Sequence, residues 1–217
     1  MRIARRRADD RGERHVGHRA GRVGLFGGSF DPIHNGHILP VLAARELLDL
    51  DVVHYLPTAR PPHKPKGTGA PALVRNTMVE LALLPYPELV VSDGELDLGR
   101  TAYTVDTVER YAAEDPEADL HLLLGVDSFN DLTAWRRFED LIGAVRLVVL
   151  ARPGERGLDP AVRAAVEGAR GFDLVRHRSV DVSSSSIRRR LSLGEEVDAG
   201  LMPAAVLRYC RKYGLYR

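Results

Sequence analysis

The chain has 217 residues, of which 44% are hydrophobic and 28% are charged, and its formal net charge is +1. This composition is ordinary for a globular protein, and the length fits one domain. No apolar run approaches the roughly 18 residues of a membrane span, which excludes a transmembrane helix. The only cysteine is Cys210, so an intrachain disulfide is excluded, and we expect a cytoplasmic protein without a membrane partner.

Residues 1–22 differ in charge from the rest of the chain. They hold eight arginines against three acidic residues, a net charge of +5, which leaves −4 for residues 23–217. The segment lacks hydrophobic periodicity and the apolar core of a signal peptide. Its arginines could form an arm for nucleic acid or an anionic surface. We expect instead a disordered basic extension that binds no nucleic acid.

The next segment predicts a strand, a glycine-rich turn and a helix. Residues 23–26 are apolar, residues 38–48 have a helical pattern, and Gly-Gly-Ser-Phe-Asp-Pro-Ile-His-Asn-Gly-His occupies positions 27–37. In this layout, backbone N–H groups and a helix N-terminus commonly face a phosphate. His34 and His37 would lie on one helix face, but we expect no metal site because no further ligands with suitable spacing follow.

Further along, apolar segments alternate with helical ones. We expect strands at 51–57, 88–92, 121–125 and 145–150, and helices at 72–84 and 104–114, the second capped by Thr104. Near-continuous apolar strands separated by helices predict a Rossmann-like, doubly wound α/β domain with a parallel sheet over residues 23–217. Ligands of such sheets bind at the carboxyl ends of the strands.

The C-terminal part, from about residue 183, predicts a small helical subdomain. Residues 180–182 resemble a strand, and a final helix is expected from Pro203 to Gly214. Between them, four serines run into a helix with Arg188 one turn inside. This arrangement could hold a phosphate, although a serine run can also be a flexible linker.

Two single residues are ambiguous when considered alone. Asp127 follows the strand at 121–125 and could either accept hydrogen bonds from ribose or cap a helix. Trp135 is the sole tryptophan and could either fill the core or stack on an aromatic ligand.

The segment GGSFDPIHNGH resembles the His-x-Gly-His signature of the adenylyltransferase superfamily, in the form typical of bacterial nicotinate-nucleotide adenylyltransferases. The similarity extends from about Val23 to Arg217. It includes Gly-Val-Asp-Ser at 125–128, Arg-Pro-Gly at 152–154, a Pro-Pro-His-Lys loop at 61–64, and Ser-Ser-Ser-Ser-Ile-Arg at 183–188. Val182 and Ser185 depart mildly from the family pattern, and Thr58 stands where many members have asparagine.

The resemblance implies roles for particular residues. The catalytic pair would be His34 and His37. Nucleotide binding would involve Gly27, Gly28, Ser29, Phe30, Gly125, Asp127, Arg152, Ser183, Ser184, Ser185, Ile187 and Arg188. Binding of nicotinate mononucleotide would involve Thr58, His63, Lys64, Tyr103, Thr104 and Trp135.

The implied reaction joins ATP and nicotinate mononucleotide to give deamido-NAD and pyrophosphate in NAD biosynthesis, with Mg²⁺ accompanying ATP. A related adenylyltransferase acting on NMN or phosphopantetheine, or a nucleotidyltransferase using CTP, is the nearest alternative. A catalytically silent nucleotide-binding regulator is an alternative of another class, and a homo-oligomer is compatible with the sequence.

Overall fold

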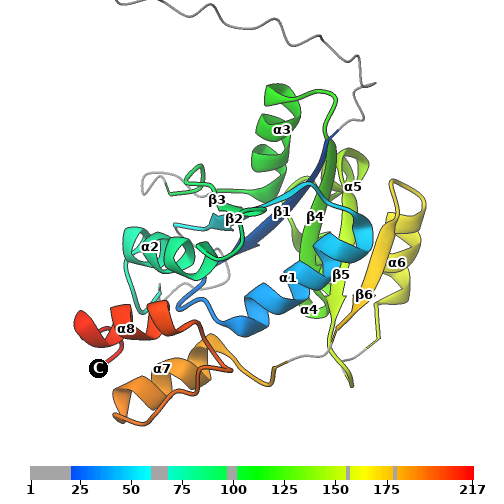
Figure 1. Cartoon of the computed structure of the whole chain (residues 1–217). Helices are drawn as coiled ribbons and strands as arrows, with labels where there is room; N and C mark the ends of the chain where they lie inside the picture. The colour runs from blue at the N-terminus through cyan, green and yellow to red at the C-terminus, as the bar shows by residue number, and fades with distance from the viewer. Residues whose placement is uncertain (1–20, 60–67, 97–101, 155–156, 178–179) are drawn as a thin grey trace, which may run out of the picture.

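The computed structural model describes residues 21–59, 68–96, 102–154, 157–177 and 180–217. Within them, parallel strands form a single sheet in the order β3-β2-β1-β4-β5-β6 (Figure 1). The strands are β1 (Arg22–Gly28), β2 (Val52–Pro57), β3 (Leu89–Val91), β4 (Asp119–Gly125), β5 (Arg146–Ala151) and β6 (Phe172–Arg176). This order reverses between β1 and β4, which confirms the predicted doubly wound sheet and places its ligand-binding crevice there.

The helices cover both faces of the sheet (Figure 1). They are α1 (Asn35–Leu48), α2 (Ala72–Leu83), α3 (Thr104–Glu114), α4 (Val126–Asn130), α5 (Phe138–Ala144), α6 (Pro160–Glu167), α7 (Ser184–Ser192) and α8 (Ala204–Lys212), with a 3-10 turn, η1 (Leu132–Ala134). α7 and α8 lie side by side, and α8 packs on α2, where Cys210 Sγ is 3.6 Å from Met78 Sδ.

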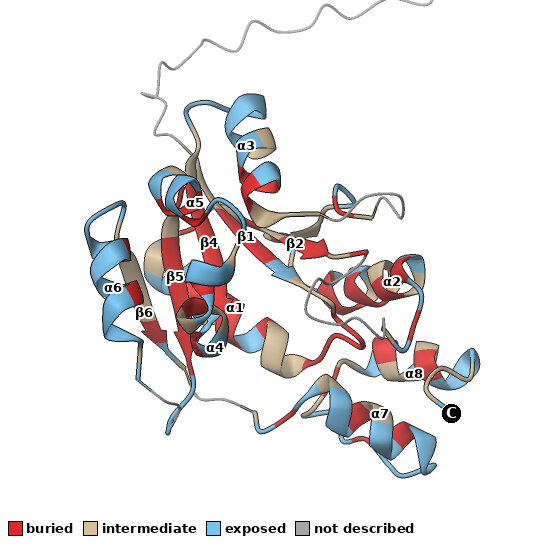
Figure 2. Cartoon of the chain, turned by 180° about the vertical axis from the view of Figure 1, so that it is seen from behind, coloured by how far each residue is buried: buried red, intermediate tan, exposed pale blue. Residues whose placement is uncertain are grey.

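β4 shows why the strand sequences are almost continuously apolar. Leu122 and Leu124 are buried in the core formed with α3, α4, α5 and α6. Leu123, between them, is buried in the opposite core with α1, α2, α7 and α8. Because successive side chains of a strand point to opposite faces, a strand covered on both faces must be apolar throughout. Figure 2 shows the resulting buried centre and the exposed outer sides of the helices.

The structure corrects the expected elements near β6. Residues 180–182 form no strand, and the sheet instead ends with β6, at Phe172–Arg176. This edge strand has a partner on one side only and contains Asp173 and Arg176, so it lacks the apolar run that marks the central strands. α5 and α6 were also not predicted. The available signal for α6 was Asp159 directly before Pro160, and its carboxylate caps the helix by accepting from the N–H groups of Ala161 and Val162.

The structure confirms the predicted range of α3, Thr104–Glu114, but the residues at two helix caps differ from expectation. Tyr103, and not Thr104, occupies the N-cap position of α3, and Pro203 precedes α8 as its N-cap. At the start of the chain, β1 already includes Arg22, while residues 1–20 of the predicted extension lie outside the described residues. In the described ranges, no helix is both long and apolar enough to cross a bilayer.

Candidate active site

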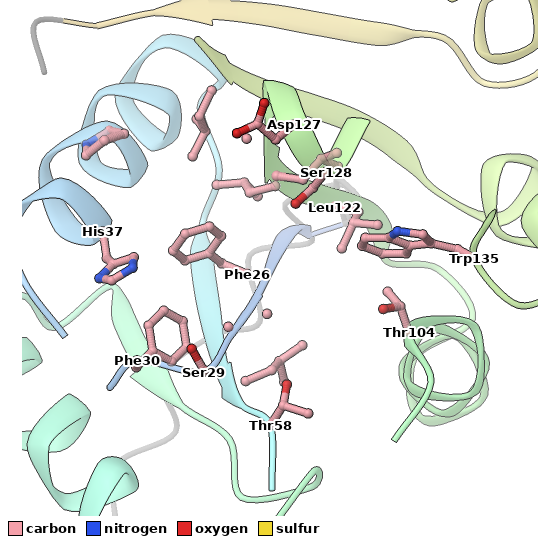
Figure 3. A pocket seen from close by; sticks show the side chains of 18 of the residues that line it. Phe26, Ser29, Phe30, His37, Thr58, Thr104, Leu122, Asp127, Ser128 and Trp135 are labelled. Carbon is pink, nitrogen blue, oxygen red and sulfur yellow. The ribbon is translucent and has the colours of Figure 1, made fainter. Parts of the chain in front are cut away.

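A cavity of about 590 Å³ opens at the carboxyl ends of β1 and β4, where the strand order reverses. Figure 3 shows that its lining comes from segments far apart in the chain. The cavity brings together the predicted residues Gly27, Gly28, Ser29, Phe30, His37, Thr58, Tyr103, Thr104, Gly125, Asp127, Trp135 and Arg152. His63 and Lys64 lie outside the described residues.

The two glycines at the end of β1 differ in their surroundings. A Cβ on Gly28 would lie 2.8 Å from the Phe30 ring, so only glycine fits beneath that ring. Phe30 itself has φ 45° and turns the chain sharply after the strand. A Cβ on Gly27 would meet no described atom within 4 Å, and this residue borders the cavity. The turn therefore offers bare backbone to a ligand at Gly27.

The histidine pair is stacked at the start of α1. The rings of His34 and His37 have centroids 3.7 Å apart and planes inclined by 25°. The backbone N–H of His34 donates to Nδ1 of His37 at 3.3 Å. A neutral imidazole whose Nδ1 accepts a hydrogen bond carries its proton on Nε2. His37 thus has an N–H donor at Nε2 and lines the cavity (Figure 3).

His34 lies behind His37 and does not line the cavity formed by the described residues. Its side chain is 2% exposed, and burial, helped by the positive charge of Arg152, lowers its pKa to about 4. The ring is therefore neutral at pH 7. Its Nδ1 is buried without a hydrogen-bond partner among the described residues.

The N-terminus of α3 forms the other end of the cavity. In the described part of the chain no side chain caps this helix start, so N–H groups of the first turn remain for a ligand or water. Trp135 lies across from Thr104 (Figure 3), and the Arg136 guanidinium stacks 4.5 Å from the centre of the Tyr103 ring. This end can bind a flat aromatic ring that carries an anionic group.

Glu95 is a cavity residue that the sequence reasoning missed. It is 7% exposed and accepts hydrogen bonds from the hydroxyls of Thr58, at 3.0 Å, and Thr107, at 2.8 Å. Burial raises its pKa, and the two hydroxyls and the charge of Arg110 oppose that rise. Its position just after β3 was the available signal, since ligands gather at the carboxyl ends of strands.

Gly125 and Asp127 mark the end of β4. Gly125 is the N-cap residue of α4, so Asp127 lies in the first helical turn and does not cap the helix. Both residues are exposed and border the cavity. The Asp127 carboxylate is therefore accessible to a polar ligand group.

α7 contacts the turn after β1 but does not line the described cavity. Ser184 Oγ donates to the Pro32 carbonyl at 3.0 Å, and Arg188 Nη1 donates to the Asp31 carbonyl at 2.8 Å. The side chain of Ser183 instead caps α7 by accepting from the Ser186 N–H at 3.1 Å. The serine run is thus a helix start and not a linker.

Ser185 and Ile187, the other two α7 residues expected to bind nucleotide, have contrasting surroundings. Ser185 is exposed, and its Oγ accepts from Arg188 Nη2 at 3.2 Å. Ile187 is fully buried in the core shared by α1, α2 and α8, and presents no surface to a ligand in this structure.

Arg75 was also missed by the sequence reasoning, although a lone arginine on the apolar face of α2 is unusual. It is fully buried, and its guanidinium donates to the carbonyls of Ser29, Thr58, Ala59 and Ala70. Burial lowers its pKa, opposed by the nearby charge of Asp31. This side chain joins the ends of β1 and β2, which carry two of the predicted site residues.

Comparisons with known proteins agree with this geometry. A family model described as cytidylyltransferase-like matches residues 25–190. A probable nicotinate-nucleotide adenylyltransferase of Thermus thermophilus is 41% identical over 199 residues, which cover 90% of this chain and 100% of the relative. A protein of Pseudomonas syringae pv. tomato with the same description is 39% identical over 210 residues, covering 90% of this chain and 94% of the relative.

A solved structure shows the same fold at lower identity. It is the Plasmodium falciparum nicotinic acid mononucleotide adenylyltransferase complexed with NaAD, with a TM-score of 0.75 and 19% identity. The match covers 90% of this chain and 97% of that chain. Because two relatives at 39% and 41% identity are covered almost completely, the chain belongs to the nicotinate-nucleotide adenylyltransferase family.

Proposed function

We propose that this chain transfers the adenylyl group of ATP to nicotinate mononucleotide, giving deamido-NAD and pyrophosphate in NAD biosynthesis. The phosphate oxygen of the mononucleotide attacks the α-phosphorus of ATP in line. A new P–O bond forms as the bond to the β-phosphate oxygen breaks, and pyrophosphate leaves with the electron pair. The attacking oxygen is already anionic, so the protein supplies positioning and charge stabilisation and no nucleophile.

One observation carries this proposal: a single cavity has an imidazole donor at one end and an aromatic wall at a helix N-terminus at the other. Nε2 of His37 would donate to an α-phosphate oxygen as charge shifts onto the leaving group. Gly27, Gly28 and the Ser29 region would bring backbone close to the phosphates. Asp127 would accept from ribose hydroxyls.

At the other end, Trp135 would stack on the pyridine ring, and the N–H groups at the start of α3 would face its carboxylate. α7 would supply Arg188 and Ser184 to the ATP phosphates from the neighbouring side of the turn. By the family resemblance, His63 and Lys64, which lie outside the described residues, would contribute to binding the phosphates. The Thr58 hydroxyl donates a hydrogen bond to Glu95. Its main role would therefore be to orient that carboxylate, and not to bind the substrate.

Mg²⁺ would enter with ATP. The described residues hold no group of three or more His, Cys, Asp and Glu side chains that could bind a metal ion. Mg²⁺ often keeps its waters and is held largely by substrate phosphates, and we expect that mode of binding here. When bound, it would neutralise charge on the β- and γ-phosphates.

The acid should be preferred over the amide. A carboxylate offers acceptors to two N–H donors, whereas an amide turns its NH₂ toward one of them and leaves a buried group unpaired. Such a mismatch costs about 1–3 kcal/mol, or roughly 5- to 150-fold in kcat/KM.

The decisive experiment measures pyrophosphate release from ATP with nicotinate mononucleotide, NMN and phosphopantetheine in turn. The proposal expects the highest kcat/KM for nicotinate mononucleotide. Equal values for acid and amide would indicate a dual-specificity adenylyltransferase, and no release with any acceptor would favour a silent nucleotide-binding regulator. Trp135→Ala should weaken both pyridine mononucleotides alike, because stacking does not read the carboxylate.

A further inference from the structure

The carboxylate of Asp31 is a junction between three parts of the chain. It is 2% exposed and lies in the turn between β1 and α1. It accepts hydrogen bonds from the backbone N–H groups of Gly69, at 2.7 Å, and Ala70, at 3.0 Å. Its third donor is the hydroxyl of Tyr216, the penultimate residue, at 2.8 Å.

Arg188 of α7 joins the same junction. Its Nη1 donates to the Asp31 backbone carbonyl at 2.8 Å and lies 3.6 Å from the Asp31 carboxylate. The side chain of Arg188 is 31% exposed, so part of its guanidinium remains open to an anion. The backbone carbonyl of Asp31 therefore positions this guanidinium, whereas the carboxylate of Asp31 competes with any phosphate for it.

Tyr216 and Arg188 also meet on one glycine. A Cβ on Gly69 would lie 3.0 Å from Cε1 of Tyr216 and 3.2 Å from Cδ of Arg188. The tyrosine ring and the arginine stem thus pack against the same backbone, ahead of α2. A shift of the tyrosine ring would therefore also displace the aliphatic part of the Arg188 side chain.

The backbone of Tyr216 adopts a conformation that is unfavourable for a residue with a side chain. Its φ is 66°, in the left-handed region that side chains other than glycine rarely adopt. The preceding Leu215 N–H donates to the Cys210 carbonyl at 2.9 Å and closes the end of α8. Burial and the negative charge of Asp31 raise the pKa of Tyr216, so the hydroxyl keeps its proton and remains a donor.

We propose that Tyr216 is a positioning residue for ATP: its hydroxyl fixes the Asp31 carboxylate, so that the Asp31 backbone carbonyl, and not this carboxylate, holds Arg188 where ATP phosphates bind. The three donors hold the Asp31 carboxylate 3.6 Å from the guanidinium, beyond hydrogen-bonding distance. Without the tyrosine hydroxyl, the carboxylate regains an unpaired acceptor and draws Arg188 away from the phosphates. This inference rests on the proposed function, in which Arg188 binds ATP.

Tyr216→Phe tests the proposal, because it removes the hydroxyl and keeps the ring. We expect the KM for ATP to rise about tenfold, with the KM for the mononucleotide changed less than twofold. Gly69→Ala should shift the same two side chains and also raise the KM for ATP. The matched control is Tyr213→Phe, which removes a hydroxyl from an exposed tyrosine three residues earlier and should leave both KM values unchanged.

Two results would overturn the positioning role. One is an unchanged KM for ATP in Tyr216→Phe. The other is an equal rise in KM for ATP and for the mononucleotide, together with a lower Tm, which is the result expected of a purely structural contact. Calorimetric titration of wild type and Tyr216→Phe with Mg-ATP alone separates this test from the proposed function. An enzyme that releases no pyrophosphate with nicotinate mononucleotide would refute that function, while the titration would still decide whether Tyr216 supports ATP binding.

Discussion

His34 and His37 are three residues apart, yet the fold gives them different environments. His37 is partly exposed and borders the cavity, whereas His34 is 2% exposed behind it. The spacing alone suggests two equivalent imidazoles. The buried His34 ring stacks on the His37 ring, and the His34 backbone N–H donates to Nδ1 of His37. His34 therefore holds the His37 ring in place.

His37→Ala should lower kcat far more than stability. Removing one preorganised donor to developing charge typically costs roughly 100- to 1000-fold in rate. The control is His54→Ala, because His54 is a partly buried histidine that contacts Tyr111 and does not line the cavity. Steady-state pyrophosphate release and thermal unfolding of both variants provide the measurement. Near-wild-type turnover in a folded His37→Ala protein would rule out a catalytic role for this ring.

The buried His34 should make stability depend on pH. Its folded-state pKa of about 4 lies below the ordinary 6.5, so the unfolded chain binds the extra proton between these values. This stability is fully present above about pH 6.5 and is lost as pH falls toward 4. Urea unfolding should show wild type losing about 2 kcal/mol more between pH 7 and pH 5 than His34→Asn. The same pH dependence in both proteins would contradict the depressed pKa.

At the scale of elements, the site depends on how the ends of β1 and β2 are joined. Arg75, on α2, donates to carbonyls beyond both strand ends, and the Thr58 N–H donates to the Gly28 carbonyl at 3.0 Å. On the other side of the turn, Asn35 N–H donates to the Leu201 carbonyl at 2.9 Å. α2 thus holds the beginning of the turn between β1 and α1, at Ser29, and the segment before α8 holds its end, at Asn35.

Arg75→Met should lower the free energy of unfolding by about 3 kcal/mol or more, because four carbonyls, two in buried and two in partly buried hydrogen bonds, each lose a donor. Urea titration at neutral pH measures this loss. Arg163→Met is the matched control, since Arg163 forms an exposed ion pair with Glu167, and such pairs contribute about 0–1 kcal/mol. If Arg75→Met unfolds at the same urea concentration as wild type, these hydrogen bonds do not stabilise the site.

For the molecule as a whole, Arg22 is the residue that fastens the start of β1 to the rest of the described domain. Its backbone N–H donates to the Asp51 carboxylate at 2.7 Å, and its Nη1 donates to the Leu48 carbonyl at 2.9 Å. Its guanidinium also lies 3.8 Å from the Asp119 carboxylate. The arginine therefore ties the first strand to β2 and β4, whereas the sequence assigned it to the basic extension.

A chain beginning at Gly21 should keep the Tm and turnover of the full-length protein. A chain beginning at Val23 should lose about 1–3 kcal/mol, because two hydrogen bonds of Arg22 disappear. Thermal unfolding and pyrophosphate release of the two shortened chains provide the comparison. A large drop in either quantity for the chain beginning at Gly21 would show that residues 1–20 contribute to the fold or the site.

Local sequence determined the central architecture. The apolar runs at 121–125 and 145–150 were sufficient to predict buried parallel strands, because covering both faces leaves no room for polar side chains. The glycine-rich turn and the pair of His34 and His37 could be recognised within eleven residues of sequence. The rule that parallel strands present their carboxyl ends together predicted where a ligand would bind, whereas the roles of individual residues came from the family resemblance.

Only the tertiary structure decided the features that depend on long-range partners. β6 is short and contains Asp173 and Arg176, and its place was set by pairing with β5. Glu95 became a cavity residue because Thr58 and Thr107 come together around it. Asp31 meets Tyr216 across 185 positions of sequence, and the low pKa of His34 arises from burial. A sequence window carries propensity and pattern, whereas burial, electrostatics and distant donors exist only once the chain has folded.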